Sequence, residues 1–424
     1  MSSINLLGST TRVEAPAISV RIGGVTFGMY NKNTKKIVDK TGVYTENKVD
    51  YPNYMQSLEI TKINGTVNTY TLTMVYGIQA GDDPNLLEKV FSKASKDRKI
   101  VFTYGDYSIP SYIYKEEEGI ITKIRSNIDF ASSKITYTIN CTSQALKVSA
   151  GTFSFPRRVA KPSDVIKELL YNDRYGLLQV FYGMHDKDKV LSKGLIASDD
   201  KPVTLEAQAS ITPLAYLNYL VTCMSNINDN TETLKKTNRY VLLINDTVSL
   251  DWEGPFFQIQ KITTSSIPQS NSIDMYEVDV GFPSNTIVTG FSVDTDDTYS
   301  ILYNYSNDIG QSNYVYRINN NGEIETQYSP TLSNTKDLMK TTEYDKTWWS
   351  QMTQYPISAT LNIKGLLKPA ILMSYVKVNV MFYGQPHIAS GNYIVTKQVD
   401  RVDSSGYRTT LSLTRLGEAE FNLI

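Results

Sequence analysis

A strand–turn–strand segment occurs twice in this chain, at an offset of 274 residues and without a gap. The first copy, GIITKIRSNIDFASSKITYTI, begins at Gly119, and the second lies in NYIVTKQVDRVDSSGYRTTLSL, which begins at Asn392, so that Gly119 aligns with Tyr393. A long internal period indicates a duplicated structural unit, so we expect a fold that contains the same β-unit twice. The identical pairs are Ile120/Ile394, Thr122/Thr396, Lys123/Lys397, Asp129/Asp403 and Thr136/Thr410, and the conservative pairs are Ile121/Val395, Ile128/Val402, Thr138/Ser412 and Ile139/Leu413.

The segment before each copy follows the same order. An apolar strand ends in Tyr104-Gly105 in one case and in Tyr383-Gly384 in the other, and a loop with Pro110 or Pro386 follows. Two unrelated β-hairpins would also share alternating Ile, Val and Thr, so chance similarity is the alternative. The common order of elements favours duplication.

The composition indicates a mainly β protein with more than one domain. The 424 residues exceed the usual size of one domain, about 100 to 200 residues, so two to four domains are expected. With 41% hydrophobic and 20% charged residues, the chain can form packed cores, which excludes a largely disordered protein. The 30 tyrosines, together with many Thr residues, favour strands over helices.

Residues 1–149 are predicted to form a first antiparallel β-barrel. Alternating apolar residues flank Gly23-Gly24 and again Asn64-Gly65, which predicts two hairpins. Asp83-Pro84 and the apolar stripe that follows predict one helix over 83–94. Three more strands are expected to end near Tyr104, Asp129 and Cys141.

The remaining chain is predicted to form three further parts. Residues 150–250 are predicted to form a small α/β domain with helices over 162–170, capped by Ser163, and over 212–224, before a strand over 240–244. Residues 251–283 and 356–424 are predicted to form a second, discontinuous β-barrel, and residues 284–355 an inserted subdomain with a helix over 336–352. The predicted fold class is mainly β with α/β parts: two similar antiparallel, tube-like β-barrels, a small α/β domain and an inserted subdomain.

The charge balance and the scarcity of histidine and cysteine exclude several functions. Lys and Arg number 42 against 43 acidic residues, so no positive excess favours tight binding to nucleic acid. His185, His387, Cys141 and Cys223 do not have the spacing of a zinc motif, and we expect the cysteines to be buried thiols. The N terminus lacks a signal-peptide pattern and no apolar run reaches membrane-spanning length, so a protein made in a cytoplasm, without a membrane segment, is expected.

The candidate catalytic and metal-binding residues have simpler structural interpretations. Glycosidases need two carboxylates, but Glu116, Glu117 and Glu118 are interpreted as a solvated turn between strands because adjacent carboxylates avoid burial. Asp294-Thr295-Asp296-Asp297 is similar to the start of a calcium loop, yet the later positions that need Gly and Glu carry Tyr. An exposed acidic loop is expected there, and a weak calcium site at 294–297 stays open.

Two other candidates are interpreted in the same way. His185-Asp186 lacks an accompanying nucleophile elbow, phosphate-binding loop or dinucleotide fingerprint, so a surface histidine is expected. Trp348 and Trp349 would point about 100° apart on a helix, so one is expected to pack and the other to mark an interface. We therefore predict no catalytic, cofactor-binding or metal-binding residue.

Two similar barrels in one chain have a consequence for assembly. Closed oligomers are usually symmetric, so three copies of the chain would present six barrels. Such a ring is threefold by chain and nearly sixfold by shape. It would suit an adapter between a threefold and a sixfold object.

The order of segments resembles the central baseplate hub proteins of contractile-tailed bacteriophages and of related injection machines. The resemblance covers the N-terminal barrel, the PSDVIKELL helix at 162–170, the helix over 212–224, and the second barrel, which closes with GNYIVTKQVDRVDSSGYRTTLSLTR from Gly391. One departure is Pro369-Ala370, where relatives commonly have Pro-Gly, which predicts a local difference in the connection before the next strand.

This resemblance implies a non-enzymatic homotrimer that stacks on the hexameric tail tube protein and holds the trimeric central spike protein on its other side. It also implies contacts with other baseplate proteins, DNA only in transit during ejection, no cofactor and no membrane. The expected location is the virion tail baseplate, assembled in the host bacterial cytoplasm. The alternative is a distal tail protein that binds carbohydrate or degrades the cell wall, which saturable glycan binding, or peptidoglycan release abolished by one carboxylate substitution, would favour.

Overall fold

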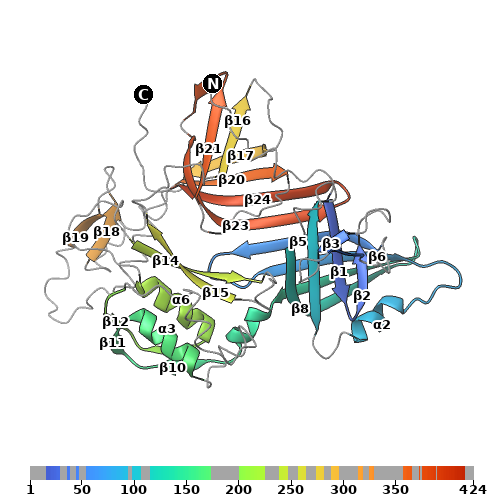
Figure 1. Cartoon of the computed structure of the whole chain (residues 1–424), viewed down its shortest axis with the longest axis horizontal. Helices are drawn as coiled ribbons and strands as arrows, with labels where there is room; N and C mark the ends of the chain where they lie inside the picture. Colours follow the sequence, from blue (N-terminus) through green and yellow to red (C-terminus); the bar gives the residue numbers. More distant parts are fainter. Residues whose placement is uncertain are drawn as a thin grey trace.

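Most of the described residues lie in strands, and the largest sheet runs through both halves of the chain (Figure 1). The fold is thus mainly β, as predicted. The computed structural model describes residues 16–28, 36–38, 44–46, 54–93, 98–106, 115–172, 200–224, 238–246, 256–263, 274–280, 288–295, 314–318, 324–328, 357–364, 372, 375–387 and 389–415.

The large sheet is almost entirely antiparallel. Among the described strands, only β16 (Asp274–Val280) runs parallel to its neighbour, β21 (Tyr375–Phe382), which also pairs with β22 (Gln385–Pro386) and β23. The remaining strands follow one another in this spatial order: β17 (Val288–Thr295), β20 (Ile357–Lys364), β24 (Gly406–Arg415), β23 (Gly391–Asp403), β5 (Met55–Ile63), β6 (Thr69–Gly77), β9 (Lys134–Ser143), β8 (Lys115–Asp129), β7 (Lys99–Asp106), β1 (Pro16–Ile22) and β2 (Val25–Gly28).

The short-range turn signals of the first 149 residues are confirmed. β1 and β2 are joined by Gly23 and Gly24, with φ of 57° and 83°, and the turn between β5 and β6 contains Gly65 at φ 69°. These left-handed backbone angles favour glycine over residues with a Cβ atom. The predicted helix is α2 (Leu86–Lys93), which follows Asp83. A short hairpin of β3 (Lys36–Val38) and β4 (Tyr44–Glu46) lies outside the large sheet.

The middle of the chain forms a separate core around two helices, α3 (Pro162–Tyr171) and α6 (Pro213–Met224), which contact each other. Both were predicted. Around them lie a 3-10 helix η1 (Gln144–Ser149) and the strand pairs β10 (Phe153–Phe155) with β13 (Gln208–Ile211), β11 (Arg158–Ala160) with β12 (Val203–Leu205), and β14 (Asn238–Asn245) with β15 (Phe256–Thr263). A further pair, β18 (Tyr314–Ile318) with β19 (Ile324–Tyr328), stands apart.

Ser163 does not cap α3 as predicted. The helix begins after Lys161, whose side chain makes no capping bond, and Pro162 occupies the first turn. Ser163 Oγ instead donates to Asp200 Oδ1 at 2.5 Å, and Asp200 Oδ2 accepts from the Ser163 backbone N–H at 2.8 Å. Asp200 therefore satisfies an N–H group that the first turn of a helix leaves unpaired.

The duplication is confirmed and extends over five strands rather than two. The neighbour order β5-β6-β9-β8-β7 in the first copy corresponds to β17-β20-β24-β23-β21 in the second. Bulges fall at equivalent positions: β8 is irregular between Ile121 and Lys123, and β23 between Val395 and Lys397. The register of β5 shifts between Met55 and Ser57 and that of β17 between Val288 and Gly290. Chance similarity of two hairpins would not reproduce these irregularities.

Two of the identical residue pairs of the repeat lie at its bulge and at its turn. Thr122 and Thr396 form the bulges, and their hydroxyls donate to the carbonyls of Asn140 and Ser412 at 3.0 and 3.1 Å. Asp129 starts the first turn, where its Oδ1 accepts from the Ala131 N–H, and Asp403 likewise accepts from the N–H two residues later. These local hydrogen bonds are typical of Asp at a turn.

The repeat contains a gap that the sequence comparison missed. Asp129 pairs with Lys134 across a turn of four residues, whereas Asp403 pairs with Gly406 across a turn of two. The return strands are therefore aligned two residues differently, so that Ile139 corresponds to Leu411 rather than to Leu413. A shift by two preserves the buried face of a strand, which is why the ungapped alignment looked consistent.

The described residues do not form the two closed barrels that were predicted. The outer part of β23, Lys397–Asp403, pairs with β5, so the two copies share one open sheet instead of closing separately. Figure 1 shows the second copy above the first, with β23 beside β5. Val402 and Tyr407, from the second copy, belong to the core of the first. The copies are therefore joined by both backbone hydrogen bonds and apolar packing.

Candidate functional site

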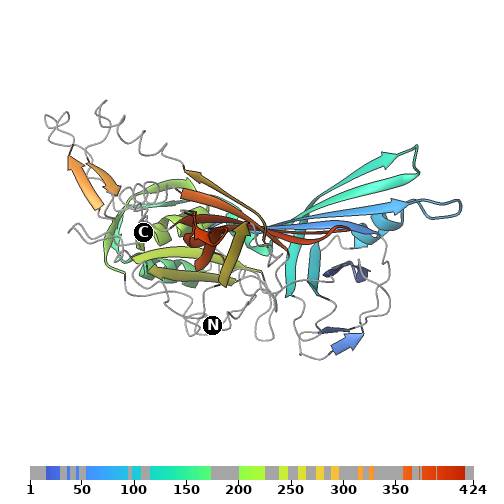
Figure 2. The ribbon, with the colours of Figure 1, turned by 90° about the horizontal axis from the view of Figure 1, so that it is seen from above.

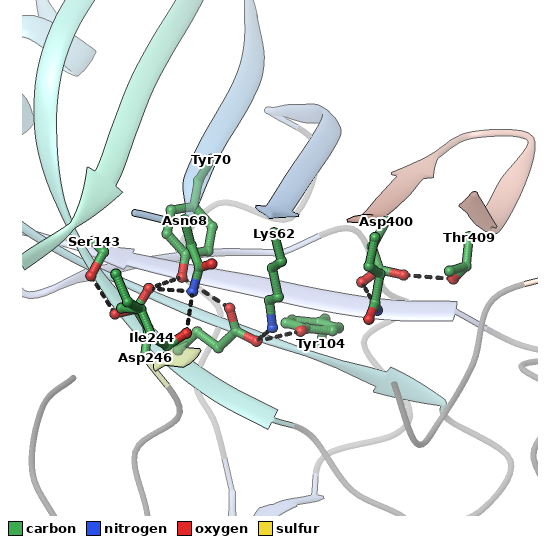
Figure 3. A network of polar contacts seen from close by, with 11 residues as sticks. Lys62, Asn68, Tyr70, Tyr104, Ser143, Ile244, Asp246, Asp400 and Thr409 are labelled. Carbon is green, nitrogen blue, oxygen red and sulfur yellow. Dashed lines mark hydrogen bonds and ion pairs between the residues drawn. The ribbon is translucent and has the colours of Figure 1, made fainter. Parts of the chain in front are cut away.

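Three buried carboxylates and one half-buried lysine lie where three parts of the molecule meet (Figure 3). Lys62 and Glu117 come from β5 and β8 of the first copy, Asp400 comes from β23 of the second copy, and Asp246 follows β14 of the α/β part. We call these four residues and their hydrogen-bond partners the polar junction. Charged residues are rarely buried without partners, so each needs its contacts identified.

Glu117 is fully buried and has the largest set of partners. It forms an ion pair with Lys62, and its two carboxylate oxygens accept from the hydroxyls of Tyr104 at 2.7 Å and Tyr70 at 3.0 Å. Burial alone would raise the pKa of Glu117, but the charge of Lys62 and the three hydrogen bonds outweigh it and lower the pKa. For Lys62, burial acts to lower the pKa, but attraction to Glu117 outweighs it, so that the pKa of Lys62 is raised. Both groups are therefore charged at neutral pH.

Asp246 connects the α/β part to the first copy. Its Oδ1 accepts from Ser143 Oγ, and its Oδ2 accepts from Asn68 Nδ2 at 2.7 Å. The Tyr70 hydroxyl lies 3.0 Å from Oδ2 and equally far from Glu117, and it has a single proton to donate. Burial, and then the charge of Glu117, raise the pKa of Asp246 to about 6, against the opposing effect of its hydrogen bonds.

Asp400 is the charged residue of the second copy that belongs to the polar junction. Its oxygens accept from Thr409 Oγ1 at 2.5 Å and from Gln398 Nε2 at 2.6 Å. Burial raises the pKa of Asp400, although the nearby charge of Lys62 and these hydrogen bonds oppose the shift. Tyr104 of the first copy packs edge-on against Tyr407 of the second, with ring centroids 6.3 Å apart. The polar junction thus lies beside an apolar contact between the same two copies.

The polar junction is closed to solvent. The exposed fractions of Glu117, Asp246 and Asp400 are 0%, 1% and 1%. A general acid or base must reach the proton that it transfers, so these carboxylates are not placed to act on a polymer such as peptidoglycan. What the arrangement can do is fix three parts of the chain in one register, because any displacement would leave a buried charge without its partner.

The interpretation of the three glutamates as a solvated turn is wrong. Glu117 and Glu118 lie within strand β8 and are buried, with Glu118 paired to Lys99 and bonded by Gln144. Alternation from the buried Ile121 does place residue 117 on the inner face, so the sequence contained the signal. The general rule that carboxylates avoid burial concealed it, because the partner Lys62 is 55 residues away.

The structure brings none of the other candidate residues into this site. Cys141 and Cys223 are buried in two different cores, and His387 is exposed, with Nδ1 accepting from the Ala389 N–H at 3.2 Å. Asp294 lies in strand β17 rather than in a loop. The following candidates lie outside the described residues: Asp296, Asp297, His185, Asp186, Trp348, Trp349, Pro369 and Ala370.

No group of three or more His, Cys, Asp or Glu side chains among the described residues is arranged to hold a metal ion. None of the helices in the described ranges is long and apolar enough to cross a membrane.

Comparison with solved structures finds tail proteins. The tail protein from Neisseria meningitidis MC58 is 10% identical, with 96% of this chain and 98% of that chain covered and a TM-score of 0.49. The 43 kDa tail protein of prophage MuSo2 from Shewanella oneidensis is also 10% identical, with coverage of 96% and 99% and a TM-score of 0.48. The chain is similar to solved tail proteins along nearly its whole length.

A third match is c3393 from Escherichia coli, a component of the type VI secretion system described as structurally similar to T4 bacteriophage tail proteins. It is 9% identical, covers 88% of this chain and 76% of its own, and has a TM-score of 0.44. The resemblance noted in the sequence is to this same class of protein. No protein-family profile and no curated protein matches the chain. Identities and TM-scores this low do not carry a function from those proteins to this chain.

Asp246 is expected to make the free energy of unfolding depend on pH. Its pKa is about 6 in the folded chain and about 3.9 when unfolded, so the stability linked to its proton is fully present below pH 4 and is lost as pH rises through 6. Relative to Asp246→Asn, which does not titrate, the native chain is expected to lose about 1 to 2 kcal/mol between pH 5 and pH 7.5. Urea unfolding of both chains at the two pH values measures this difference.

Glu117 does not confuse this measurement, because its pKa is lowered and its titration therefore moves away from the compared pH range. The raised pKa of Asp400 acts in the same direction in both chains, so it cancels in the comparison. A stability difference that is the same at both pH values would contradict a raised pKa at Asp246.

Proposed function

We propose that the chain is a structural, non-enzymatic baseplate hub of a contractile phage tail. In this proposal three copies form a ring that joins the hexameric tail tube to the trimeric central spike, contacts other baseplate proteins, and lets DNA pass during ejection. The ring belongs to the virion tail and is assembled in the host bacterial cytoplasm. The polypeptide divides into a first repeat, an α/β part and a second repeat interrupted by an insertion.

One observation carries this proposal: a five-strand unit occurs twice in one chain, and the two copies join edge to edge in a single sheet. A unit that pairs with its own duplicate along one edge presents a further, similar edge to a neighbour. Repetition of that contact builds a ring or a helix, and closed rings are the common outcome. Three chains would then supply six units, which fits one threefold and one sixfold partner.

The polar junction supports the same reading. It holds the two copies and the α/β part in one fixed arrangement, as a ring under load during contraction requires. The net formal charge of −1 also supports it, since a channel wall without a positive excess would not retain passing DNA.

Native mass spectrometry at micromolar concentration, with electron-microscope averages of the same sample, tests the proposal. We expect a species of three times 47.7 kDa that appears as a ring with six similar lobes. A chain that stays monomeric alone and after mixing with tube and spike proteins would contradict the hub. Glycan binding would then be the next property to measure.

A further inference from the structure

The contact between the two copies within one chain has a fixed register. β23 pairs with β5 from Lys397 opposite Ile63 to Asp403 opposite Ser57. Leu58, which is fully buried, lies opposite Val402, which is 3% exposed. We call this contact the inner junction. It places the buried apolar side chains of the two strands next to each other.

β8 is the counterpart of β23 in the first copy, and β17 is the counterpart of β5 in the second. The edges of β8 and β17 that correspond to the inner junction have no partner strand among the described residues. In β8, residues 123–129 pair with β9 on one side only, because β7 pairs with the earlier half of the strand. β17 pairs with β20 and ends the path of the sheet. The β8–β9 hairpin, in turquoise, projects away from the rest of the molecule in Figure 2.

Apolar side chains on both free edges are less buried than their counterparts in the inner junction. Ile128 corresponds to Val402 and is 55% exposed rather than 3%. On β17, Phe291 and Val293 are half-buried, whereas their counterparts Leu58 and Ile60 are 0% and 1% exposed. Exposed apolar residues on an unpaired edge mark a surface that another strand covers.

The two edges are complementary in the register of the inner junction. β23 residues lie 274 positions after their β8 counterparts, and β17 residues lie 233 positions after their β5 counterparts, as the shared bulges fix. Transferring the β5–β23 pairs in this way places Ile128 opposite Phe291, and Arg125 opposite Asp294. The first is an apolar pair and the second pairs opposite charges on the solvent side, both of which stabilise adjacent strands.

We propose that residues 123–129 of β8 pair, antiparallel, with β17 of a second copy of this chain, in the register of the inner junction. This inference rests on the proposed ring and names the strands that close it. The two edges do not pair with each other in the single chain, where β20, β24, β23, β5, β6 and β9 lie between them in the sheet. Two complementary edges on one molecule give a head-to-tail contact, which closes when the rotation per chain divides a full turn.

The new contact, which we call the outer junction, lacks the charges of the inner one. Ser126 stands at the position of Asp400, Gly391 at the position of Glu117, and Thr295 at the position of Lys62. If the β23–β24 hairpin paired with β17 of a neighbouring copy instead of with β5, Asp400 would be buried without Lys62 nearby. The cost of burying this unpaired charge disfavours pairing of β23 with β17. The inner and outer junctions therefore alternate around the ring.

Disulfide trapping tests the outer junction. Asn127 and Ser292 are both exposed and fall opposite each other in the proposed register, where the Cα atoms of an antiparallel pair lie close enough for a disulfide. The chain with Asn127→Cys and Ser292→Cys, oxidised with copper phenanthroline, is expected to run as a covalent trimer without reductant and as a single chain with it. The native cysteines are buried, so the parent chain is the blank.

The matched control is Lys123→Cys with Ser292→Cys, which moves one thiol four residues along the strand and out of disulfide range. It is expected to remain uncrosslinked, while circular dichroism reports that both variants fold. A trimer in native mass spectrometry without the crosslink, or with equal crosslinking of the control, would overturn this junction and leave the hub standing. A chain that never trimerises would overturn both.

Discussion

Replacing Lys62 with methionine is expected to lower the free energy of unfolding by about 3 to 5 kcal/mol at neutral pH. The variant leaves Glu117 fully buried without its cation, and the hydroxyls of Tyr70 and Tyr104 cannot neutralise the charge. Methionine fills a similar volume, so the loss reports the charge rather than a cavity. Urea unfolding followed by circular dichroism measures it.

The effect is expected to shrink at low pH. Without Lys62, burial dominates and raises the pKa of Glu117, so the folded variant takes up a proton that the native chain does not. A raised carboxyl pKa gives stability that is present at low pH and lost as pH rises through it, so the variant recovers on acidification. Lys62→Met with Glu117→Gln is expected to regain part of the loss even at neutral pH, because it removes the buried charge.

Lys89→Met is the matched control for the ion pair itself. Lys89 pairs with Asp83 at 2.6 Å on the surface, where its side chain is 64% exposed, so this change is expected to cost less than about 1 kcal/mol. Equal losses for the Lys62 and Lys89 variants would contradict a special role of the buried pair.

The sequence predicted those elements whose signals are local. Gly23-Gly24 and Asn64-Gly65 identify two turns because their backbone angles favour glycine, and helix α6 follows from a helix-period apolar face. The repeat was visible because Thr122 and Asp129, with their counterparts, hold a bulge and a turn that other residues would form less well. These features depend on neighbours a few residues away.

The features that depend on distant partners could not be predicted in the same way. The bulge at Thr396 reverses the alternation along β23, so Asp400 faces inward although a regular strand continued from Val395 would turn it outward. Closed barrels were predicted from the order of hairpins and strands and from the repeat, and no local pattern shows that β5 pairs with a strand more than 300 residues later. The polar junction combines both difficulties, since its charges come from three separate parts of the chain.

Replacing Ile128 with aspartate is expected to abolish the ring while leaving the single chain folded. Ile128 is 55% exposed in one chain, so the change should alter its unfolding free energy by no more than about 0.5 kcal/mol. In the outer junction the new carboxylate would be buried opposite Phe291 of the next copy, without a cation to pair with. We expect assembly to need at least about 100-fold more protein, which for a closed ring of three contacts corresponds to about 1.8 kcal/mol at each contact.

Phe130→Asp is the control that separates a lost contact from added charge on the same hairpin. Phe130 is 88% exposed in the turn, beyond the last residue pair of the proposed register, so this variant is expected to assemble as the native chain does. Mass photometry across a concentration series compares the three chains. Loss of the ring with Phe130→Asp as well would show that charge near the hairpin tip is enough, and retention of the ring with Ile128→Asp would show that this face of β8 is not covered in the assembly. Only loss with Ile128→Asp and retention with Phe130→Asp fits a strand edge that continues the sheet from one copy into the next.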